Sequence, residues 1–415
     1  MPQLSTRTAH FTDSVIRRMT RISNRYGAIN LSQGFPDFDP PKEITERLAE
    51  VAKQGPHQYA LTWGAQNFRE ALAEKHKRFS GQSVDPDKEI VVTCGSTEAM
   101  MAAMMSVTNP GDKVIVFSPF YENYGADAIL SGAEPIYVSL NPPEFSFDHE
   151  ELEKAFKQGA KAIIVCNPSN PSGKVFSYEE LSEIADLAKK YDTFVITDEV
   201  YEHIIYEPYK HVYMSTLPDM KDRTIICNSL SKTYSITGWR LGYVIANEEV
   251  IDRVKKVHDF LTVGAAAPLM EAATKGLRFG DEYYDELRKH YTHMKELFLG
   301  GLRDIGFTFV EPQGAYYVMI DVSEYGVKDD TRFCEWMAEH VGVAAVPGSS
   351  FFKEDIQNYI RLHFAKNDDT LNEALERLSH FKDIVTNASD ISEKTRIYLK
   401  RYVLVFHLEI IMAEI

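Results

Sequence analysis

The sequence has 415 residues, of which 44% are apolar, and its formal net charge at pH 7 is −16. A chain of this length and composition can form about two or three domains with buried cores. The negative charge argues against a nucleic acid partner, because proteins bind phosphate backbones through clustered lysine and arginine side chains.

The cysteines and the apolar runs exclude further classes of protein. The four cysteines lie far apart without CxxC or CxxH spacing, so neither a disulfide framework nor a zinc site is favoured. Cys94, Cys166 and Cys227 each end or follow an apolar run, which predicts small buried side chains. No apolar run reaches the ~18 residues that span a bilayer, and the arginine-rich N-terminus lacks a hydrophobic signal core. We therefore expect no metal site, no membrane partner and a cytoplasmic location.

The first 41 residues predict one helix followed by an irregular arm. An apolar stripe at helical spacing follows Asp13 and is stopped by Gly27. Glycine and proline are dense between residues 28 and 41, which indicates a loop. Two further helices are expected over residues 42–53 and 66–80.

From residue 89 onward, short apolar runs alternate with amphipathic helical segments. Near-continuous apolar runs are typical of parallel strands that are buried on both faces of a sheet. One helix begins with a capping box, Ser177 followed three residues later by Glu180. The pattern predicts an α/β fold with a mostly parallel seven-stranded sheet sandwiched by helices. The predicted strands are 90–93, 114–117, 135–138, 162–165, 194–197, 224–226 and 243–245, and the helices are 97–108, 121–130, 150–156 and 178–190.

The remainder of the chain predicts a helical stretch and a smaller α+β unit. Residues 249–301 have helical patterns, and two strands are expected further on, at 316–320 and 359–364. The segment 383–415 fits neither unit. We therefore divide the chain into an N-terminal helix and arm that belong to the small domain (1–41), a large domain (42–285), a small C-terminal domain (286–382) and an atypical C-terminal extension (383–415).

A hydroxyl-rich loop from Asn228 to Arg240 lies between two of the predicted strands. Its serine hydroxyls and the Arg240 guanidinium suit a phosphate dianion. Its one lysine, Lys232, suits an aldehyde, because a desolvated amine forms Schiff bases. Pyridoxal 5′-phosphate (PLP) carries both groups, so the loop indicates PLP, although Lys232 alone could be a surface lysine in a polar turn.

Three more polar motifs follow predicted strands, and ligands bind at that end of a doubly wound sheet. Ser96 and Thr97 open a helix whose N–H groups can hold an anion, or they simply cap it. Asn170 lies in a turn with two Asn-Pro pairs, which is either turn chemistry or a rigid amide facing a phenolic oxygen. Asp198 ends an apolar strand, where a carboxylate needs a pyridinium or a nearby lysine or arginine, and Tyr201 donates to the ring oxygen or packs. Together the four motifs predict PLP as the cofactor.

With these motifs the chain resembles the class I and II aminotransferases, which are PLP enzymes of fold type I. The resemblance covers about residues 12–382 and includes Asp198-Glu199-Val200-Tyr201, Ser229-x-Ser231-Lys232 and Gly238-Trp239-Arg240-Leu241-Gly242. The loop 31–38 resembles the methionine, glutamine and kynurenine aminotransferase branch. The resemblance implies transfer of the amino group of an L-amino acid to a 2-oxo acid, by a ping-pong mechanism through a Lys232 Schiff base in the large domain.

The resemblance also assigns roles to individual residues. The implied catalytic residues are Lys232, Asp198 and Tyr201. The implied cofactor-binding residues are Tyr59, Ser96, Thr97, Tyr121, Asn170, Asp198, Tyr201, Ser229, Ser231, Lys232 and Arg240. The implied substrate-binding residues are Gly34, Asn170 and Arg361.

Three of these residues carry specific expectations. Tyr121 matches the aromatic residue that stacks on the cofactor ring. Tyr59 matches a tyrosine that reaches the phosphate of the partner subunit, which implies a homodimer with shared active sites. Arg361 matches the arginine that binds the substrate α-carboxylate, although its sequence context alone also allows an ordinary surface charge.

Several alternatives stay open or are disfavoured. A PLP-dependent C–S β-lyase would share nearly every residue named, and an aspartate or alanine aminotransferase would share the same frame. Aromatic residues near the predicted pocket favour an aromatic, methionine or glutamine donor. A DNA-binding regulator of the same fold would need an N-terminal winged-helix domain and a basic surface. A nicotinamide dehydrogenase would need a GxGxxG motif after the first strand, which is absent.

Overall fold

The computed structural model describes residues 2, 4–9, 11, 13–381 and 384. At its centre is a seven-stranded sheet with the order β2-β8-β7-β6-β5-β3-β4. Strand β8 is antiparallel to both of its neighbours, and the remaining pairs are parallel. All seven predicted strands are present, which confirms the predicted sheet. They are β2 (Ile90–Thr93), β3 (Lys113–Ser118), β4 (Glu134–Ser139), β5 (Ala160–Cys166), β6 (Phe194–Asp198), β7 (Thr224–Ser229) and β8 (Gly242–Ile245).

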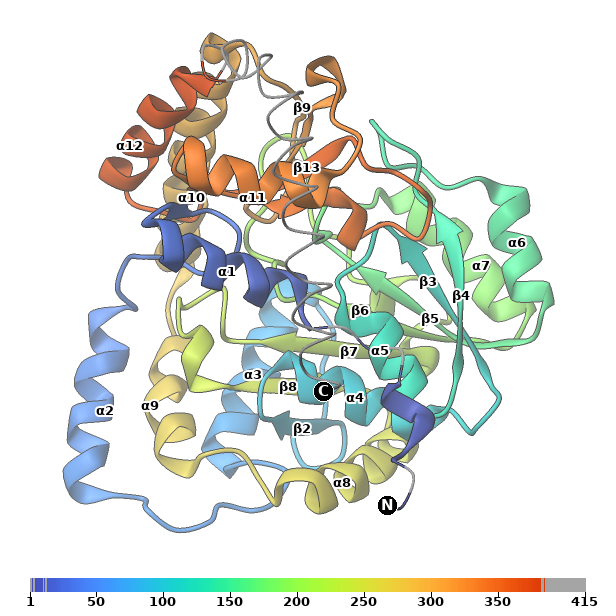
Figure 1. Ribbon diagram of the computed structural model, residues 1–415. Coiled ribbons are helices and arrows are strands. Elements are labelled where there is room, and N and C mark those ends of the chain that lie inside the picture. The colour runs from blue at the N-terminus through green and yellow to red at the C-terminus, as the bar shows by residue number, and fades with distance from the viewer. Residues whose placement is uncertain (1, 3, 10, 12, 382–383, 385–415) are drawn as a thin grey trace.

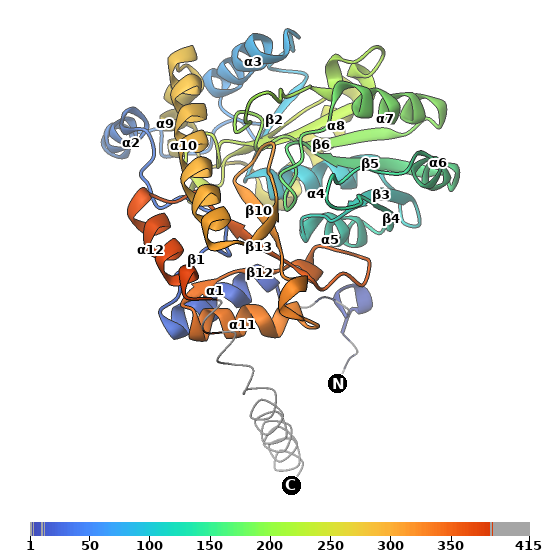
Figure 2. The same ribbon diagram turned by 90° about the horizontal axis from the view of Figure 1, so that it is seen from above.

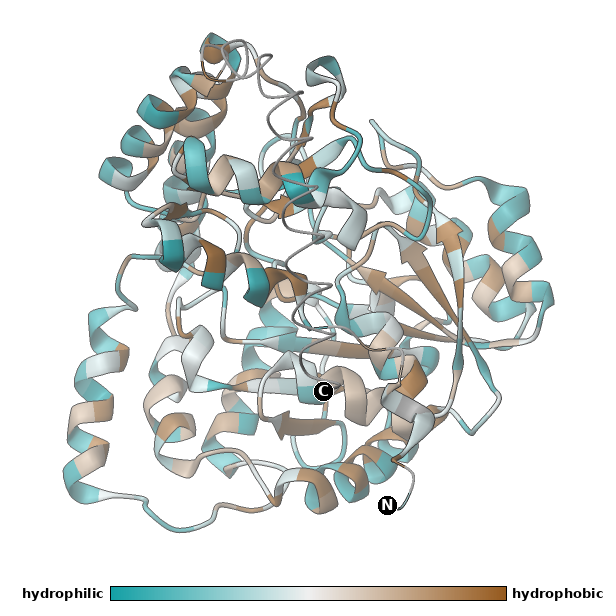
Figure 3. Ribbon diagram, in the orientation of Figure 1, coloured by the Kyte–Doolittle hydropathy of each residue, from teal (hydrophilic) through white to brown (hydrophobic). Residues whose placement is uncertain are grey.

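Helices cover both faces of this sheet, as Figures 1 and 2 show. Alternate residues of a strand enter different cores; in β5, Ala162 and Ile164 face one core, and Ile163 and Val165 face the other. This explains why the strands are near-continuously apolar along their length (Figure 3). One face is covered by α4 (Ser96–Val107), α5 (Asn123–Leu130) and α8 (Glu248–Thr262), and the other by α6 (His149–Lys157) and α7 (Tyr178–Lys190).

A third group of helices packs around the β2 edge of the sheet and the lysine loop. It shares a core with Ile90 and Val92 of β2 and with Leu230 and Tyr234 of the loop. The helices are α2 (Lys42–Gln54), α3 (Gln66–Ser80) and α9 (Ala267–Leu277).

A second unit joins the N-terminal segment to the C-terminal third of the described chain (Figures 1 and 2). Met19 and Leu31 share its core with residues from 287 to 381. Its antiparallel sheet has the order β12-β13-β10-β9, and β1 pairs with β11 in parallel. Its elements are α1 (Val15–Tyr26), β1 (Ile29–Asn30), α10 (Asp281–Ile305), β9 (Thr308–Val310), β10 (Tyr317–Asp321), α11 (Asp330–His340), β11 (Val343–Ala344), β12 (Val346–Pro347), β13 (Tyr359–His363) and α12 (Asp368–Ser379).

The domain boundaries stay predictions. Helix α10 runs without interruption from Asp281 to Ile305 and crosses the proposed boundary after residue 285. The proposed extension 383–415 lies outside the described residues except for residue 384.

Several local expectations can be compared with the structure. The capping box of Ser177 and Glu180 is present at the start of α7. Strand β10 begins at Tyr317, one residue later than predicted. All four cysteines are free. The prediction that Cys94 is buried is wrong: its side chain is half-buried, because it lies in the turn before α4. Among the described helices, none is long and apolar enough to span a bilayer.

Candidate active site

The Lys232 amine lies in the loop between β7 and β8 and points toward the arm that precedes α2. Its Nζ donates a hydrogen bond to the carbonyl of Gly34 at 3.1 Å. It lies 5.8 Å from the ring centre of Tyr201 and 5.6 Å from that of Tyr316. Removal from water lowers the pKa of Lys232 to about 8, although the charge of Asp198 opposes the change. The amine can therefore exchange a proton near neutral pH.

The Asp198 carboxylate is buried at the end of β6. Its Oδ2 accepts a hydrogen bond from the Tyr124 hydroxyl at 2.7 Å, and its Oδ1 accepts one from the backbone N–H of Val200 at 3.4 Å. Burial raises the pKa of Asp198 to about 6, while these two hydrogen bonds and the charge of Lys232 act to lower it. The carboxylate is thus mostly ionised at neutral pH and is available to a cationic ring nitrogen.

A close approach of β8 to α4 builds an anion cradle. Gly95 is the N-cap of α4 and has φ 84°, and a Cβ there would lie 2.3 Å from Nη2 of Arg240. A Cβ on Gly242 would overlap the backbone of Gly95 and Ser96. The guanidinium is therefore held at the helix N-terminus, where the N–H groups and the helix dipole attract an anion.

Ser96, Thr97, Ser229 and Ser231 gather around this cradle. Ser96 and Thr97 are the first two residues of α4. Ser229 is paired with Gly242 across the sheet, which brings it next to the turn before α4, and its Oγ accepts from the Ser231 N–H at 3.4 Å. The structure thus brings together every predicted phosphate ligand of this chain.

Arg361 on β13 is a buried cation that has a hydrogen-bond donor without a partner. Its Nη1 donates to Oδ1 of Asn170 at 2.6 Å, and its Nη2 donates to the carbonyl of Ser32 at 2.8 Å. The guanidinium carbon lies 4.2 Å from the ring centre of Tyr317 and 4.6 Å from that of Phe351. Its Nε has no hydrogen-bond partner, and among the described residues the groups that act on its charge are tyrosines and not carboxylates. A buried guanidinium of this kind needs an anion, and a carboxylate fits it bidentately.

Three tyrosines and the arm around Gly34 close the site between Lys232 and Arg361. The Tyr316 hydroxyl donates to the same Gly34 carbonyl as Lys232, at 2.9 Å. The Tyr201 and Tyr317 hydroxyls are hydrogen-bonded to each other at 2.9 Å. A Cβ on Gly34 would overlap the Tyr317 hydroxyl, so this position has room only for glycine.

The two remaining predicted residues differ in their placement. Tyr121 is within electrostatic reach of Tyr317, Asp198 and Arg361, and burial raises its pKa. Tyr59 is 87% exposed and is not part of the site of its own chain.

The sequence gives no indication of several residues that complete this site. Tyr124 contacts Asp198 across 74 residues of sequence, and its only signal is that it lies three residues after Tyr121. Ser32 acts through its backbone carbonyl, which no side-chain pattern reveals. Tyr317 reaches Arg361 through the pairing of β10 with β13, and Phe351 reaches it from the turn after β12.

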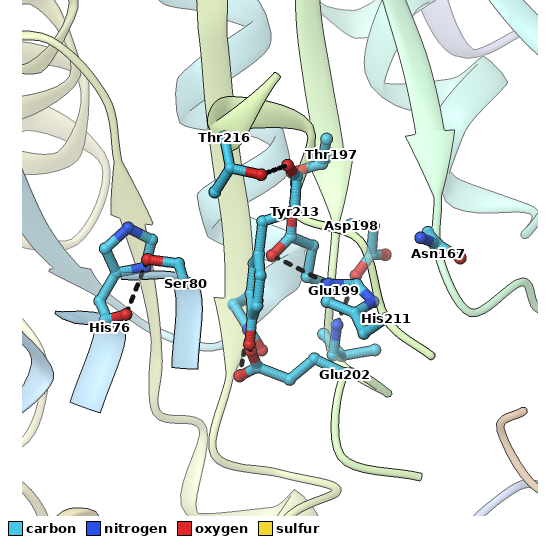
Figure 4. Close-up of polar contacts among 12 residues, drawn as sticks. His76, Ser80, Asn167, Thr197, Asp198, Glu199, Glu202, His211, Tyr213 and Thr216 are labelled. Atoms are coloured by element: carbon cyan, nitrogen blue, oxygen red, sulfur yellow. Dashed lines mark hydrogen bonds and ion pairs between the residues drawn. The ribbon is translucent and has the colours of Figure 1, made fainter. Parts of the chain in front are cut away.

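A buried polar network lies behind Asp198 (Figure 4). Oε1 of Glu202 accepts from Nζ of Lys75 at 2.6 Å and from Nδ2 of Asn228 at 2.9 Å, and its Oε2 accepts from the Tyr213 hydroxyl at 2.6 Å. The network therefore fixes the turn that carries Asp198 to α3 and to the end of β7.

Two neighbours extend this network into a group that resembles a metal site. Ligand atoms of Glu199, Glu202 and His211 lie within 4.8 Å of one another, and His211 Nε2 is 3.5 Å from Oε2 of Glu199. Both oxygens of Glu202 already accept hydrogen bonds, and the Lys75 ammonium supplies the positive charge. We therefore assign a structural role, and not a metal-binding role, to these three residues.

Comparisons with known proteins agree on one family. The model of the family "Aminotransferase class I and II" matches residues 26–378. Methionine aminotransferase of Escherichia coli is 36% identical over 379 residues, which are 91% of this chain and 96% of that protein. Human kynurenine–oxoglutarate transaminase 3 is 33% identical, with 86% of each chain covered.

Solved structures give the same result. A methionine aminotransferase structure from Escherichia coli has a TM-score of 0.88 at 35% identity and covers 92% of this chain and 99% of that chain. An N-succinyldiaminopimelate aminotransferase from Mycobacterium tuberculosis also has a TM-score of 0.88, at 34% identity, with 91% of this chain and 99% of that chain covered. The chain therefore belongs to the class I and II aminotransferases and is a PLP-dependent enzyme that moves amino groups between amino acids and 2-oxo acids.

Proposed function

We propose that this aminotransferase takes L-amino acids with apolar or aromatic side chains, methionine among them, and gives their amino group to a 2-oxo acid. The observation that carries the proposal is the environment of Arg361. Its guanidinium is buried between two aromatic rings, and its Nε is left without a partner. Such a site accepts an α-carboxylate and surrounds it with apolar surface.

The residues at the strand ends fit PLP. The cradle of Arg240 and the α4 N-terminus suits its phosphate, and the Asp198 carboxylate suits its ring nitrogen. Asn170 uses Oδ1 to accept from Arg361, which leaves its NH₂ group free to donate to the ring oxygen together with the Tyr201 hydroxyl. When bound, the cofactor supplies an electron sink for the charge left on the substrate Cα.

Lys232 is the group that we propose to move the substrate proton. Its lowered pKa leaves part of the amine neutral at physiological pH, and a neutral amine can accept the proton from Cα and return it elsewhere. The Gly34 carbonyl orients the amine through its hydrogen bond. Arg361 and Asn170 hold the substrate so that its Cα–H bond is presented to Lys232.

The cations near the site support an apolar donor. An acidic donor such as aspartate would need a second cation for its distal carboxylate. Lys366 is the nearby candidate, but its Nζ donates to the carbonyl of Phe35 at 3.2 Å and lies 4.4 Å from the centre of that ring. The relatives cover several donors by name, including methionine, kynurenine, aromatic amino acids and aspartate. Because the relatives differ in their donors, the proposal for an apolar donor rests on the residues of this site and not on the relatives.

A panel of donors tests the substrate proposal. With 2-oxoglutarate or pyruvate as acceptor, we expect kcat/KM for methionine and phenylalanine to exceed that for aspartate by about tenfold or more, because aspartate would bury an unpaired carboxylate. A preference for aspartate would contradict the proposal. Release of pyruvate from a cysteine conjugate without any 2-oxo acid, faster than transamination, would favour the alternative C–S β-lyase.

The Arg361→Lys variant tests the carboxylate site in the same assay. A lysine keeps the charge but loses the two-pronged geometry, so we expect kcat/KM for every donor to fall by about 100-fold. Arg332→Lys, at an exposed arginine of α11, is the matched control and should leave the rate unchanged. Equal rates for the Arg361 variant and the control would exclude Arg361 as the carboxylate ligand.

The Tyr124→Phe variant tests how the Asp198 carboxylate is tuned. The hydroxyl stabilises the ionised carboxylate, so its loss should raise the pKa of Asp198 above about 6 by roughly one unit. Binding of pyridoxamine 5′-phosphate, which has no aldehyde to react with Lys232, should then weaken on the acid side, with the acid limb of its pH profile moved up by about one unit. Tyr137→Phe, whose hydroxyl lies beside Gly125 and not beside Asp198, is the control. An unshifted acid limb in Tyr124→Phe would contradict this role.

We also propose that the enzyme is a homodimer with shared active sites. Tyr59 and Phe260 belong to a set of large apolar side chains that face solvent, and are 87% and 90% exposed. Leu61, Leu261 and Val263 belong to the same two segments and are about half exposed. The two segments lie side by side, since His258 of one is hydrogen-bonded to the Thr62 carbonyl of the other at 2.8 Å, and their exposed apolar side chains support an interface with a second copy of the chain. The four free cysteines support a cytoplasmic location.

The Phe260→Asp variant tests the dimer. A carboxylate in the centre of an apolar interface is costly, so the sedimentation mass should fall from that of two chains to that of one. Tyr178→Asp, at an exposed tyrosine of α7, should leave the mass unchanged. A wild-type protein that sediments as a single chain would refute the homodimer.

A further inference from the structure

The His258 ring is buried between the cofactor-phosphate helix and the segment that carries Tyr59. It lies on α8 and is 0% exposed. Its Nδ1 lies 2.5 Å from Oε1 of Glu98 on α4, and its Nε2 lies 2.8 Å from the carbonyl oxygen of Thr62. One side chain thus connects α4 to the segment 59–64.

The hydrogen-bond partners define the protonation state of this ring. A carbonyl oxygen only accepts, so Nε2 must carry a proton. Glu98 accepts from the backbone N–H of Cys94 at 2.5 Å and from the Thr262 hydroxyl at 3.0 Å. Burial acts to raise the pKa of Glu98, but its hydrogen bonds to His258, Cys94 and Thr262 outweigh burial and lower it, which favours the ionised carboxylate with the second proton on Nδ1. His258 is therefore an imidazolium that donates in two directions.

The surrounding charges agree with that state. Burial acts to lower the pKa of His258, but the hydrogen bond and charge of Glu98, the Thr62 carbonyl and the charge of Asp259 outweigh it, and the pKa is raised. The other titratable group nearby, the Cys94 thiol, has a raised pKa and stays neutral. The bridge is therefore present below the raised pKa of His258, extends to higher pH than it would for an unperturbed histidine, and is lost as the pH rises through that pKa.

Each end of the bridge lies in a segment that carries predicted phosphate ligands. Glu98 is the third residue of α4, directly after Ser96 and Thr97, and its bond to the Cys94 N–H fixes the turn that holds Arg240. At the other end, Thr62 is three residues after Tyr59. The segment has a second anchor, because the Trp63 carbonyl accepts from the N–H of Val92 on β2 at 3.0 Å.

We propose that His258 is a positioning residue that couples the two phosphate sites of the dimer, because it fixes the Tyr59 segment that serves the partner's site to the helix that binds phosphate in its own site. The inference rests on the proposed dimer with shared sites. Tyr59 itself is highly exposed and has no contact that orders it within its own chain, so its reach depends on the rigidity of the segment. The Glu98–His258–Thr62 bridge supplies that rigidity.

A double-mutant cycle on PLP affinity tests this coupling. The PLP dissociation constant of the full-length protein is measured by fluorescence for wild type, Tyr59→Phe, His258→Ala and the double variant. We expect Tyr59→Phe to weaken binding about tenfold in wild type and less than about threefold in the His258→Ala background, because a segment without its anchor no longer presents the hydroxyl. Asp252→Asn, at an exposed residue of α8 whose charge is not among those that shift the pKa of His258, is the control background and should keep the full tenfold effect.

A pH profile separates positioning from a general loss of stability. The Tyr59→Phe penalty should decline as the pH rises and the ring loses its second proton. In a Glu98→Gln background, which removes the charge that raises the pKa of His258, the decline should begin at lower pH. This variant keeps a similar shape and also serves if His258→Ala fails to fold.

The outcomes distinguish the two proposals. If Tyr59→Phe has no effect on PLP affinity in wild type, the shared site is refuted and the coupling falls with it. If the effect is present but undiminished in His258→Ala, or its pH profile does not move in Glu98→Gln, the coupling alone is overturned.

Discussion

The removal of two opposite charges from water, at the ends of neighbouring strands, is the constraint on which this active site depends. Burial raises the pKa of Asp198 to about 6 and lowers that of Lys232 to about 8, and each charge limits the shift of the other. At neutral pH the acid is mostly ionised while the amine is partly neutral. These are the states that hold a protonated ring nitrogen and accept a proton from carbon. An exposed lysine would stay almost fully protonated at neutral pH, so the partly neutral amine depends on this burial.

The fold provides this environment through close backbone contacts. The parallel sheet is buried on both faces, so its strands deliver side chains to one edge without solvent beneath them. Gly95 and Gly242 allow β8 to approach the start of α4, which puts the Arg240 guanidinium at the helix N-terminus. The network of Glu202 and Lys75 holds the Asp198 turn from behind. The second unit then contributes Arg361 and the arm around Gly34, which closes the site from the other side.

Much of the fold can be predicted from the sequence, because its strands are near-continuous apolar runs of the length expected for a buried sheet. The capping box of α7 is a local signal and is present as predicted. Asp198 and Arg361 could be proposed because each places a charged group in an apolar strand, where it needs a partner. Lys232 and Arg240 could be proposed because they lie in a hydroxyl-rich loop that suits an aldehyde and a phosphate.

Contacts between distant parts of the chain could not be predicted in this way. Tyr124 reaches Asp198 from α5, a helix that packs on β3, β4 and α4, and no local pattern specifies that contact. Ser32 and Thr62 act through carbonyl groups, which every residue has. His258 lies in a stretch predicted only as helical, and its role depends on Glu98, 160 residues earlier. Pairwise tertiary contacts of this kind leave no periodic trace in the sequence.

Rapid-scanning absorbance of the Lys232→Ala variant, mixed with a single amino donor, tests the central claim most directly. The variant keeps the phosphate cradle and Asp198, so it should still take up PLP. Conversion of its bound cofactor to the pyridoxamine form should be at least about 10³-fold slower than in wild type, because the proton-transferring amine is gone. Conversion within tenfold of the wild-type rate would show that another group moves the proton and would contradict the account.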